Sequence, residues 1–342
     1  MKWPSCSLLL TVLLVMSSHA AQPTGCLPAL PVPIRVSIAE AAIVDARLQA
    51  SSSGLAVVAA ADGRQLWSAA GSAPADQLFE PMQVAFAGSL MALDLDGDGL
   101  HDRIYAGDLA SRLWRFDLHH GAPSSAWASG GMLADFSSAA GRAFVAAPDV
   151  SLSTSADGSW FNIAIGTASL PGSATGNRFY VVRDNAPFEA WTDADYARWV
   201  PLREGDLVRL ANPASTPPPS MRHGYFIELT HGEVLMPSIT VAGRAVLAIA
   251  DSASSSATQC RVAVSVAVVD VASAVAPGKP SGGGTANAWR ERLPVAVAAT
   301  ARFELAASSQ GEAACTLDGQ QIAACAVATR PVRTWWRRGD AE

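Results

Sequence analysis

Residues 89–106 read Ser89-Leu-Met-Ala-Leu-Asp94-Leu-Asp-Gly-Asp-Gly-Leu-His-Asp102-Arg-Ile-Tyr-Ala106. Two short apolar segments with partly β-favouring residues flank an acidic, glycine-containing loop. Apolar segments of this length, bounded by turn residues, are typical of strands. The stretch therefore predicts two β-strands joined by the loop Asp94–Asp102, which we call the Asp94 loop.

The Asp94 loop has the pattern D-x-D-x-D-G-x-x-D, with carboxylates at positions one, three, five and nine. The glycine at position six permits a sharp turn, and position seven can offer a backbone carbonyl. Four carboxylates in so short a loop repel one another unless a cation lies between them. Oxygen ligands in this spacing favour calcium over a solvated acidic turn, and the predicted ligands are Asp94, Asp96, Asp98, the carbonyl of Leu100, and Asp102.

The loop differs from an EF-hand. An EF loop carries a glutamate at position twelve, where this chain has Tyr105, and it lies between two helices rather than two strands. Calcium would therefore fix a strand-to-strand connection. Such a site can be a rigid structural element or a sensor, because the affinity ranges of the two overlap.

The N-terminus has the features of a secretory signal peptide. Lys2 precedes the apolar run Leu8–Val15, and small residues lead to Ala20, after which we expect cleavage. The apolar run is too short for an ordinary membrane span, and no later segment reaches about 18 uninterrupted apolar residues. The mature chain is expected to be exported and soluble, in the periplasm, at the outer-membrane surface or on a pilus.

Signal cleavage removes Cys6 and leaves four cysteines, which an oxidising compartment would join in two disulfides with three possible connectivities. The segment Cys315–Cys325 reads as a hairpin around Asp318-Gly319, so we expect its ends to be paired. Cys26 would then pair with Cys260 by default. A zinc site is not expected, because no CxxC pair or histidine cluster accompanies these cysteines.

The formal charge of −6 argues against binding to nucleic acids or to anionic membrane surfaces. The rest of the chain consists of short β-favouring runs separated by turn residues, which indicates an all-β sandwich, barrel or propeller. The expected strands include 54–60, 113–117, 160–165, 178–182, 234–241, 244–250 and 261–269. One helix is expected from Thr192 to Arg198, with Asp195 completing a capping pattern.

A loose repeat favours the propeller. Ala61–Trp67 and Gly107–Leu118 both contain a turn, a polar stretch and then Leu-Trp, as repeated propeller blades often do. We predict a signal peptide at 1–20, a β-propeller-like domain at 21–276 and a Gly/Pro/Ser-rich linker at 277–286. A C-terminal β segment with the disulfide hairpin would follow at 287–342.

Taken together, the motifs resemble the C-terminal β-propeller domain of the PilY/PilC family of type IV pilus proteins. The Asp94 loop, Tyr105-Ala-Gly-Asp108 and Leu113-Trp-Arg-Phe-Asp117 carry the first part of the resemblance. Further segments follow in the same order, namely Ala164–Thr167, Gly176–Asn185, Gly232–Ile239 before Cys260, and Arg330–Trp336. The resemblance spans roughly residues 85 to 336.

This resemblance implies a modified or partial propeller with a calcium loop between strands. It also implies a role in pilus biogenesis, in calcium-dependent control of extension against retraction, or in adhesion. The family's metal ligands fall on the same five residues of the Asp94 loop. The implied partners are pilus components such as minor pilins, or a surface ligand.

Parts of the sequence also suggest two other functions. The segment Ala61–Trp67 also looks like a blade repeat of quinone-dependent dehydrogenases, but the chain has no regular series of Trp repeats, no HExxH and no GxSxG, so an enzyme is not expected. The second is a calcium-stapled extracellular binding module, lectin-like or integrin-like, unrelated to pili. Integrin-type propellers use a similar loop, so the loop alone does not separate these two functions.

Overall fold

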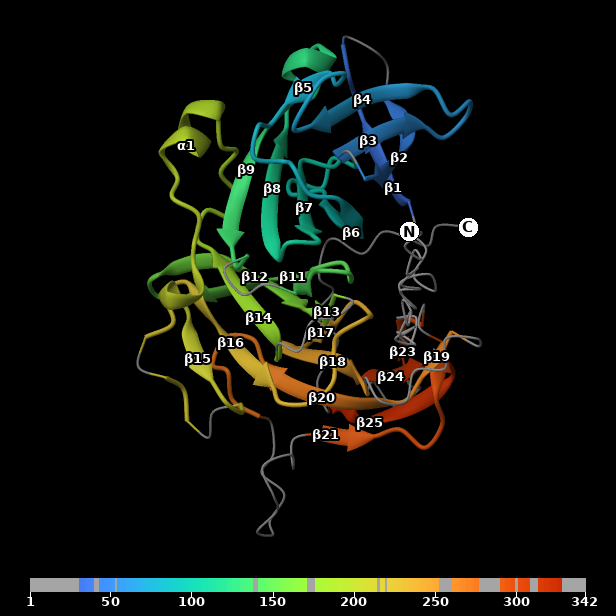
Figure 1. Cartoon of the computed structure of the whole chain (residues 1–342), viewed down its shortest axis with the longest axis vertical. Coiled ribbons are helices and arrows are strands. Elements are labelled where there is room, and N and C mark those ends of the chain that lie inside the picture. The colour runs from blue at the N-terminus through green and yellow to red at the C-terminus, as the bar shows by residue number, and fades with distance from the viewer. Residues whose placement is uncertain are drawn as a thin grey trace, which may run out of the picture.

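The computed structural model describes residues 31–39, 43–52, 54–137, 141–170, 176–213, 216–218, 220–251, 260–276, 290–298, 301–307 and 313–327. Strands dominate this part of the chain, which confirms the all-β class. Figure 1 shows the sheets in chain order, from the blue β1–β5 at the top, through the green strands in the middle, to the orange and red strands at the bottom.

The first sheet has the order β1-β2-β3-β4-β5, antiparallel except for the parallel pair β4–β5. The second sheet is an antiparallel meander in the order β6-β7-β8-β9. The strands of these two sheets are β1 (Val32–Val36), β2 (Val44–Ala50), β3 (Gly54–Ala59), β4 (Gln65–Ala70), β5 (Gln77–Leu78), β6 (Phe86–Leu93), β7 (Arg103–Asp108), β8 (Arg112–Leu118) and β9 (Ala128–Asp135).

The third sheet has the order β11-β12-β14-β16-β15, and the fourth has the order β17-β18-β20-β21. Strand β21 comes after the predicted linker, so the segment that follows the linker contributes a strand to the sheet that precedes it. The strands are β11 (Asp149–Ser155), β12 (Gly158–Gly166), β14 (Asn177–Asp184), β15 (Val208–Leu210), β16 (Gly224–Leu229), β17 (Ile239–Val241), β18 (Arg244–Ala250), β20 (Val264–Asp270) and β21 (Arg290–Arg292).

Smaller elements complete the described structure. Two strand pairs are β10 (Arg142–Ala143) with β13 (Ala168–Ser169), and β19 (Arg261–Val262) with β22 (Val297–Ala298). A three-stranded sheet contains β23 (Phe303–Ala307), β24 (Ala313–Leu317) and β25 (Gln320–Val327). The helical segments are α1 (Asp193–Arg198) and the 3-10 turns η2 (Ser124–Ala126) and η3 (Glu204–Asp206).

Apolar cores lie between successive sheets, as they do between propeller blades. In β7, Ile104 belongs to the core shared with the first sheet, whereas Tyr105 belongs to the core shared with the third sheet. In β14, Tyr180 belongs to the core shared with the second sheet, and Val181 belongs to the core shared with the fourth sheet. Because successive side chains point to opposite faces, a strand buried on both faces reads as a continuous apolar run.

The loose Trp repeat corresponds to a shared core. The turns at 60–64 and 109–111 each join two antiparallel strands, and Trp67 and Trp114 follow them in β4 and β8. Both tryptophans are completely buried in the core between the first and second sheets. Trp67 also packs edge-to-face against Trp127, with the two ring centroids 5.1 Å apart. The two copies of the loose repeat therefore lie on neighbouring sheets and contribute their tryptophans to one core.

The predicted helix is confirmed. Thr192 caps α1: its side chain accepts a hydrogen bond from the backbone N–H of Asp195, and the side chain of Asp195 accepts one from the backbone N–H of Thr192. This capping box satisfies two N–H groups that the first turn leaves without helical partners.

The predicted hairpin around Asp318-Gly319 is also present. Leu317 pairs with Gln320, and both turn residues have positive φ, 51° for Asp318 and 74° for Gly319. Cys260 and Cys315 are each disulfide-bonded. The pairing of Cys315 with Cys325 and of Cys26 with Cys260 stays a prediction, because Cys26 and the side chain of Cys325 lie outside the described residues.

The predicted signal peptide at 1–20, the linker at 277–286 and the segment Arg330–Trp336 also lie outside the described residues. Within the described part of the chain, none of the helices has the length and apolar character needed to cross a bilayer.

Candidate functional site

The Asp94 loop connects β6 to β7, the first hairpin of the second sheet. Leu93 and Arg103 are the last paired residues before it, and the N–H of Asp102 donates to the carbonyl of Leu93 at 2.7 Å. The flanking elements are strands, as predicted. The loop is therefore held at both ends by the ladder of a buried hairpin.

Three of the predicted ligands come together. One carboxylate oxygen from each of Asp94, Asp96 and Asp102 lies within 4.8 Å of the others. Calcium binds oxygen at about 2.3–2.6 Å, so two ligands of one ion can be separated by up to about 5 Å. The three carboxylates therefore fit a single calcium ion, and hard oxygen donors are the chemistry that this ion selects.

The structure does not bring Asp98 into this group. Its Oδ1 instead accepts a hydrogen bond from the N–H of Leu100 at 2.7 Å, and its side chain is exposed. The assignments of Asp98 and of the Leu100 carbonyl as ligands stay predictions.

Backbone geometry orients the first carboxylate. Gly97 and Gly99 have φ of 81° and 91°, in the left-handed region that glycine adopts without steric cost. Their N–H groups donate to the two carboxylate oxygens of Asp94 at 2.7 and 2.9 Å. The glycines thus fold the loop back over Asp94 and fix its carboxylate.

Asp102 has a distinct electrostatic environment. Its Oδ2 accepts from the N–H of Leu95 at 2.6 Å, and its Oδ1 lies 3.7 Å from Nε2 of His120. Partial burial acts to raise the pKa of Asp102, but the interactions with His120 and Leu95 outweigh it, so this pKa is lowered. The same contact with Asp102 raises the pKa of His120. Asp102 therefore stays ionised, as a cation ligand must.

The loop also touches the first sheet. The N–H of His101 donates to the carbonyl of Arg35, and the N–H of Arg35 donates to Nδ1 of His101 at 3.1 Å. Nearby, the N–H of Ser37 approaches Nδ1 of His120 at 3.4 Å. Ordering of the loop is therefore coupled to β1 as well as to its own hairpin.

A buried charged cluster follows directly after the loop, and the sequence reasoning missed it. Arg103, Arg115, Asp117, Asp184 and Tyr105 are all at most 2% exposed. Asp117 pairs with both guanidinium groups at 2.8 to 3.1 Å, and Asp184 accepts from Arg115 at 2.9 Å and from the hydroxyl of Tyr105 at 2.5 Å. Burial acts to lower the pKa of Arg115, but the interactions with Asp184, Tyr105 and Asp117 together outweigh it, so this pKa is raised.

This cluster ties β7 and β8 to the segment after β14. Arg103 donates to the carbonyls of Pro187 and Glu189, and Arg115 also donates to the carbonyl of Glu189. The guanidinium carbon of Arg115 lies 4.3 Å from the ring centroid of Trp191. The sequence did carry a signal for this cluster, because charged residues stand at alternate positions of apolar strands. Such residues share one face of the sheet, and when that face is buried their charges must neutralise one another.

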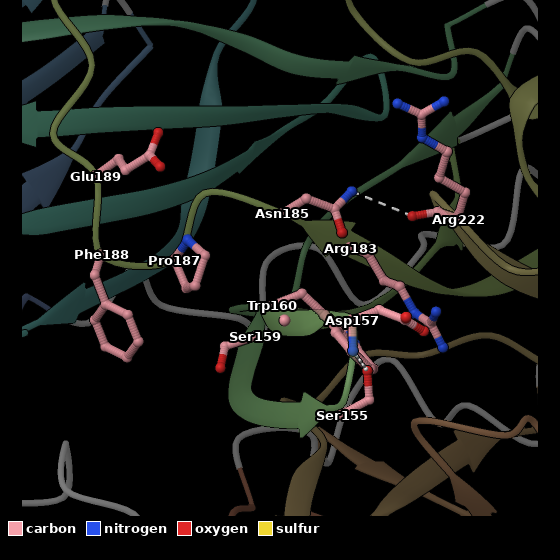
Figure 2. A pocket seen from close by; sticks show the side chains of 11 residues that line it. Ser155, Asp157, Ser159, Trp160, Arg183, Asn185, Pro187, Phe188, Glu189 and Arg222 are labelled. Atoms are coloured by element: carbon pink, nitrogen blue, oxygen red, sulfur yellow. Dashed lines mark hydrogen bonds between the residues drawn. The ribbon is translucent and has the colours of Figure 1, made fainter.

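The segment from Pro187 to Glu189 also lines an open pocket of about 600 Å³. Figure 2 shows Phe188 and Pro187 on one side, Trp160 in the middle, and Asn185 directed at the backbone carbonyl of Arg222. The lining includes two carboxylates, Asp157 and Glu189, and two guanidinium groups, Arg183 and Arg222. Because the lining carries two negative and two positive side chains, its charge favours neither anions nor cations.

Similarity to known proteins is found in the fold rather than in the sequence. No protein-family model matches the chain, and no curated protein sequence matches it. Among solved structures, it is similar to the crystal structure of the Pseudomonas aeruginosa PilY1 C-terminal domain, with a TM-score of 0.57 and 14% identity over 87% of this chain and 74% of that chain. A second match, Citrobacter koseri AztD, has a TM-score of 0.16, which is too low to indicate a shared fold. The chain therefore has a β-propeller-like fold similar to that of the PilY1 C-terminal domain.

Proposed function

We propose that this protein is an exported calcium-binding β-propeller-like protein of type IV pilus biogenesis, which tunes pilus extension and retraction or adhesion. The observation that carries the proposal is the convergence of Asp94, Asp96 and Asp102 within 4.8 Å, on a hairpin of a PilY1-like fold. The proposed role is binding and regulation rather than catalysis, and the proposed partners are pilus components such as minor pilins.

Calcium would supply the positive charge that offsets the repulsion between the loop carboxylates. Asp94 and Asp102 are already oriented by backbone N–H groups, so the loop would lose little conformational freedom on binding. The contacts of His101 with Arg35 in β1, and of His120 with Ser37 just after β1, would then transmit loop ordering to the junction of the first two sheets. A change in that junction would alter the surface available to a pilus component.

The metal site is tested by calorimetric titration of residues 21–342 with calcium, beside the Asp96→Ala variant. We expect one site, weakened at least about tenfold in the variant because a charged ligand is lost. The matched control is Asp157→Ala, which removes an exposed carboxylate from the β11–β12 turn and should leave calcium affinity unchanged. Equal affinity in the wild type and in Asp96→Ala would show that the ligand assignment is wrong.

The pilus role needs a separate test in the producing cells. Deletion of the gene should reduce surface pili or twitching motility, wild-type protein should restore it, and Asp96→Ala should restore assembly but not its calcium dependence. Unchanged pili, together with intact calcium binding, would refute the pilus role. The alternative of a calcium-stapled surface-binding module, lectin-like or integrin-like, would then remain.

A further inference from the structure

A second pocket, of about 560 Å³, lies between β5, β9 and α1. We call it the aromatic pocket. Its partly exposed side chains include Phe79, Met132, Tyr196 and Trp199, and its charged lining residues are Asp76 and Asp193. Its volume is in the range of sites that hold small molecules or single side chains.

The aromatic rings are held in place by their polar edges. The hydroxyl of Tyr196 donates to Asp117 at 2.6 Å, and Nε1 of Trp199 donates to the carbonyl of Leu133 at 3.1 Å. Their hydrogen-bond donors are therefore used within the protein. What the rings offer a ligand is apolar surface and the negative potential of their faces.

The charged residues at the pocket have one sign. Among the lining residues, all of which belong to the described part of the chain, none is Lys, Arg or His. The carboxylate of Asp76 accepts from the hydroxyls of Ser68 and Ser124, at 2.8 and 3.0 Å. Both donors are neutral, so these bonds do not compensate its charge. The neighbouring Arg112 donates to the carbonyl of the lining residue Pro81 at 3.0 Å, and its guanidinium carbon lies 5.6 Å from the ring centroid of Trp114. Its charge is paired with Asp108 at 2.6 Å, and Arg112 is not itself among the lining residues.

Exposed apolar side chains border the same pocket. Leu78 is 57% exposed and lines it, and Val200, which is 78% exposed, lies between the lining residues Trp199 and Pro201. Large apolar side chains at the rim of a cavity are typical of a binding surface. A bare metal ion would find few oxygen ligands here, whereas a cation with an apolar body would contact both kinds of surface.

We propose that the aromatic pocket binds an organic cation, an alkylammonium or guanidinium group on an apolar stem. The group would lie against Phe79, Tyr196 and Trp199, with Asp76 and Asp193 facing its charge. The ligand chemistry is shared by free amines and by Lys or Arg side chains of a protein partner. This inference does not depend on calcium binding.

The test compares each cation with a neutral molecule of the same shape, by NMR titration of the full mature chain. Choline is paired with 3,3-dimethyl-1-butanol, and N-acetyl-lysine methylamide with N-acetyl-norleucine methylamide. We expect cation dissociation constants in the millimolar range and neutral analogues bound at least about fivefold more weakly. Preference for choline would favour a free small-molecule cation, and preference for the lysine derivative would favour a protein partner.

Variants locate the site. Asp193→Asn removes one exposed charge and should weaken cation binding about threefold, whereas Asp157→Asn, which removes the same charge at the other pocket, should have no effect. Phe79→Leu keeps an apolar side chain but removes the ring, so it should reduce the preference for the cation over its neutral analogue. Urea unfolding of each variant checks that the fold is retained.

The same titrations in Asp96→Ala protein separate this inference from the proposed function, because cation binding should be unchanged there. Equal binding of charged and neutral probes would overturn the inference, as would saturable binding that Asp193→Asn and Asp157→Asn weaken equally. Absence of binding by every cation at concentrations that saturate a millimolar site would also overturn it.

Discussion

Asp184 shows how much can depend on one buried carboxylate. It faces the guanidinium of Arg115 and the hydroxyl of Tyr105, and none of these three groups is exposed to water. A buried charge is tolerated only when it is paired and hydrogen-bonded, and removal of one partner leaves the other charge uncompensated.

We therefore expect Asp184→Ala to lower the free energy of unfolding by about 3–5 kcal/mol. Arg209→Ala is the control, because it breaks the ion pair between Arg209 and Glu228, and the Arg209 side chain is 70% exposed. Loss of this exposed pair should lower the free energy of unfolding by at most about 1 kcal/mol. Urea denaturation of both variants measures the difference. Similar losses in the two variants would show that the buried cluster contributes no more than a surface pair.

Glu233 makes the stability depend on pH. It is 5% exposed, its Oε2 accepts from the N–H of Ser169 at 3.1 Å, and burial raises its pKa above the ordinary value of 4.5. A group with a raised folded-state pKa contributes stability below its unfolded pKa and loses it as pH rises through the folded value. At a pH above the folded-state pKa, the buried charge of Glu233 therefore lowers the stability.

Glu233→Gln mimics the neutral form at every pH. We expect the variant to match the wild type below about pH 4.5 and to become more stable than the wild type as pH rises. The measurement is the difference in urea unfolding free energy between the two proteins from pH 4 to 8, which cancels other titrating groups. A difference that does not change with pH would contradict the raised pKa.

At the scale of elements, α1 depends on its N-terminal cap. The helix has only six residues, from Asp193 to Arg198, and it packs against β9. Helices this short have little intrinsic stability, so the cap and tertiary contacts must maintain them.

Thr192→Ala should lower the free energy of unfolding by about 1 kcal/mol, because the N–H of Asp195 loses its side-chain acceptor. Thr192→Ser keeps the hydroxyl and should retain most of the stability. Chemical denaturation compares the two variants. If the serine variant lost as much stability as the alanine variant, the methyl group rather than the cap would be responsible.

Elements also show where sequence patterns succeed and fail. The run Arg244–Ala250 was predicted as a strand and is β18 over the same residues. The run 234–241 was predicted as one strand, but only Ile239–Val241 is a strand, because Pro237 lacks the N–H that a continuous ladder needs. The run 261–269 is divided into β19 and β20 at Ala263, since its two parts pair with different strands, β22 and β18.

At the scale of the whole molecule, calcium would act as a ligand of the folded state. The Asp94 loop contacts both the second sheet and, through His101 and Arg35, the first. A ligand that binds only the folded protein stabilises it by about 2.7 kcal/mol at a concentration 100 times its dissociation constant.

Removal of calcium with EGTA should therefore lower the unfolding temperature of the wild-type protein, and excess calcium should restore it. Asp96→Ala should already have the lower value and should not respond to EGTA. Differential scanning calorimetry measures both. A wild-type protein indifferent to calcium and chelator would contradict a stabilising role for the ion.

The β class, the hairpin around the Asp94 loop, the helix cap at Thr192 and the turn at Asp318-Gly319 could all be predicted from the sequence. These features arise from local rules: side-chain alternation, glycine at positive φ, and hydrogen bonds between residues a few positions apart. The same spacing placed Asp94, Asp96 and Asp102 in one loop, where the structure brings their oxygens together.

Contacts between different sheets follow from tertiary packing alone. The cluster of Arg103, Arg115, Asp117 and Asp184 joins residues separated by up to 81 positions, and the aromatic pocket joins β5, β9 and α1. No local pattern specifies such contacts, because they depend on strand register and on which sheet packs against which face. The sequence therefore indicated where a cation could bind one loop, and the packing of sheets determined where charges and aromatic rings from distant segments meet.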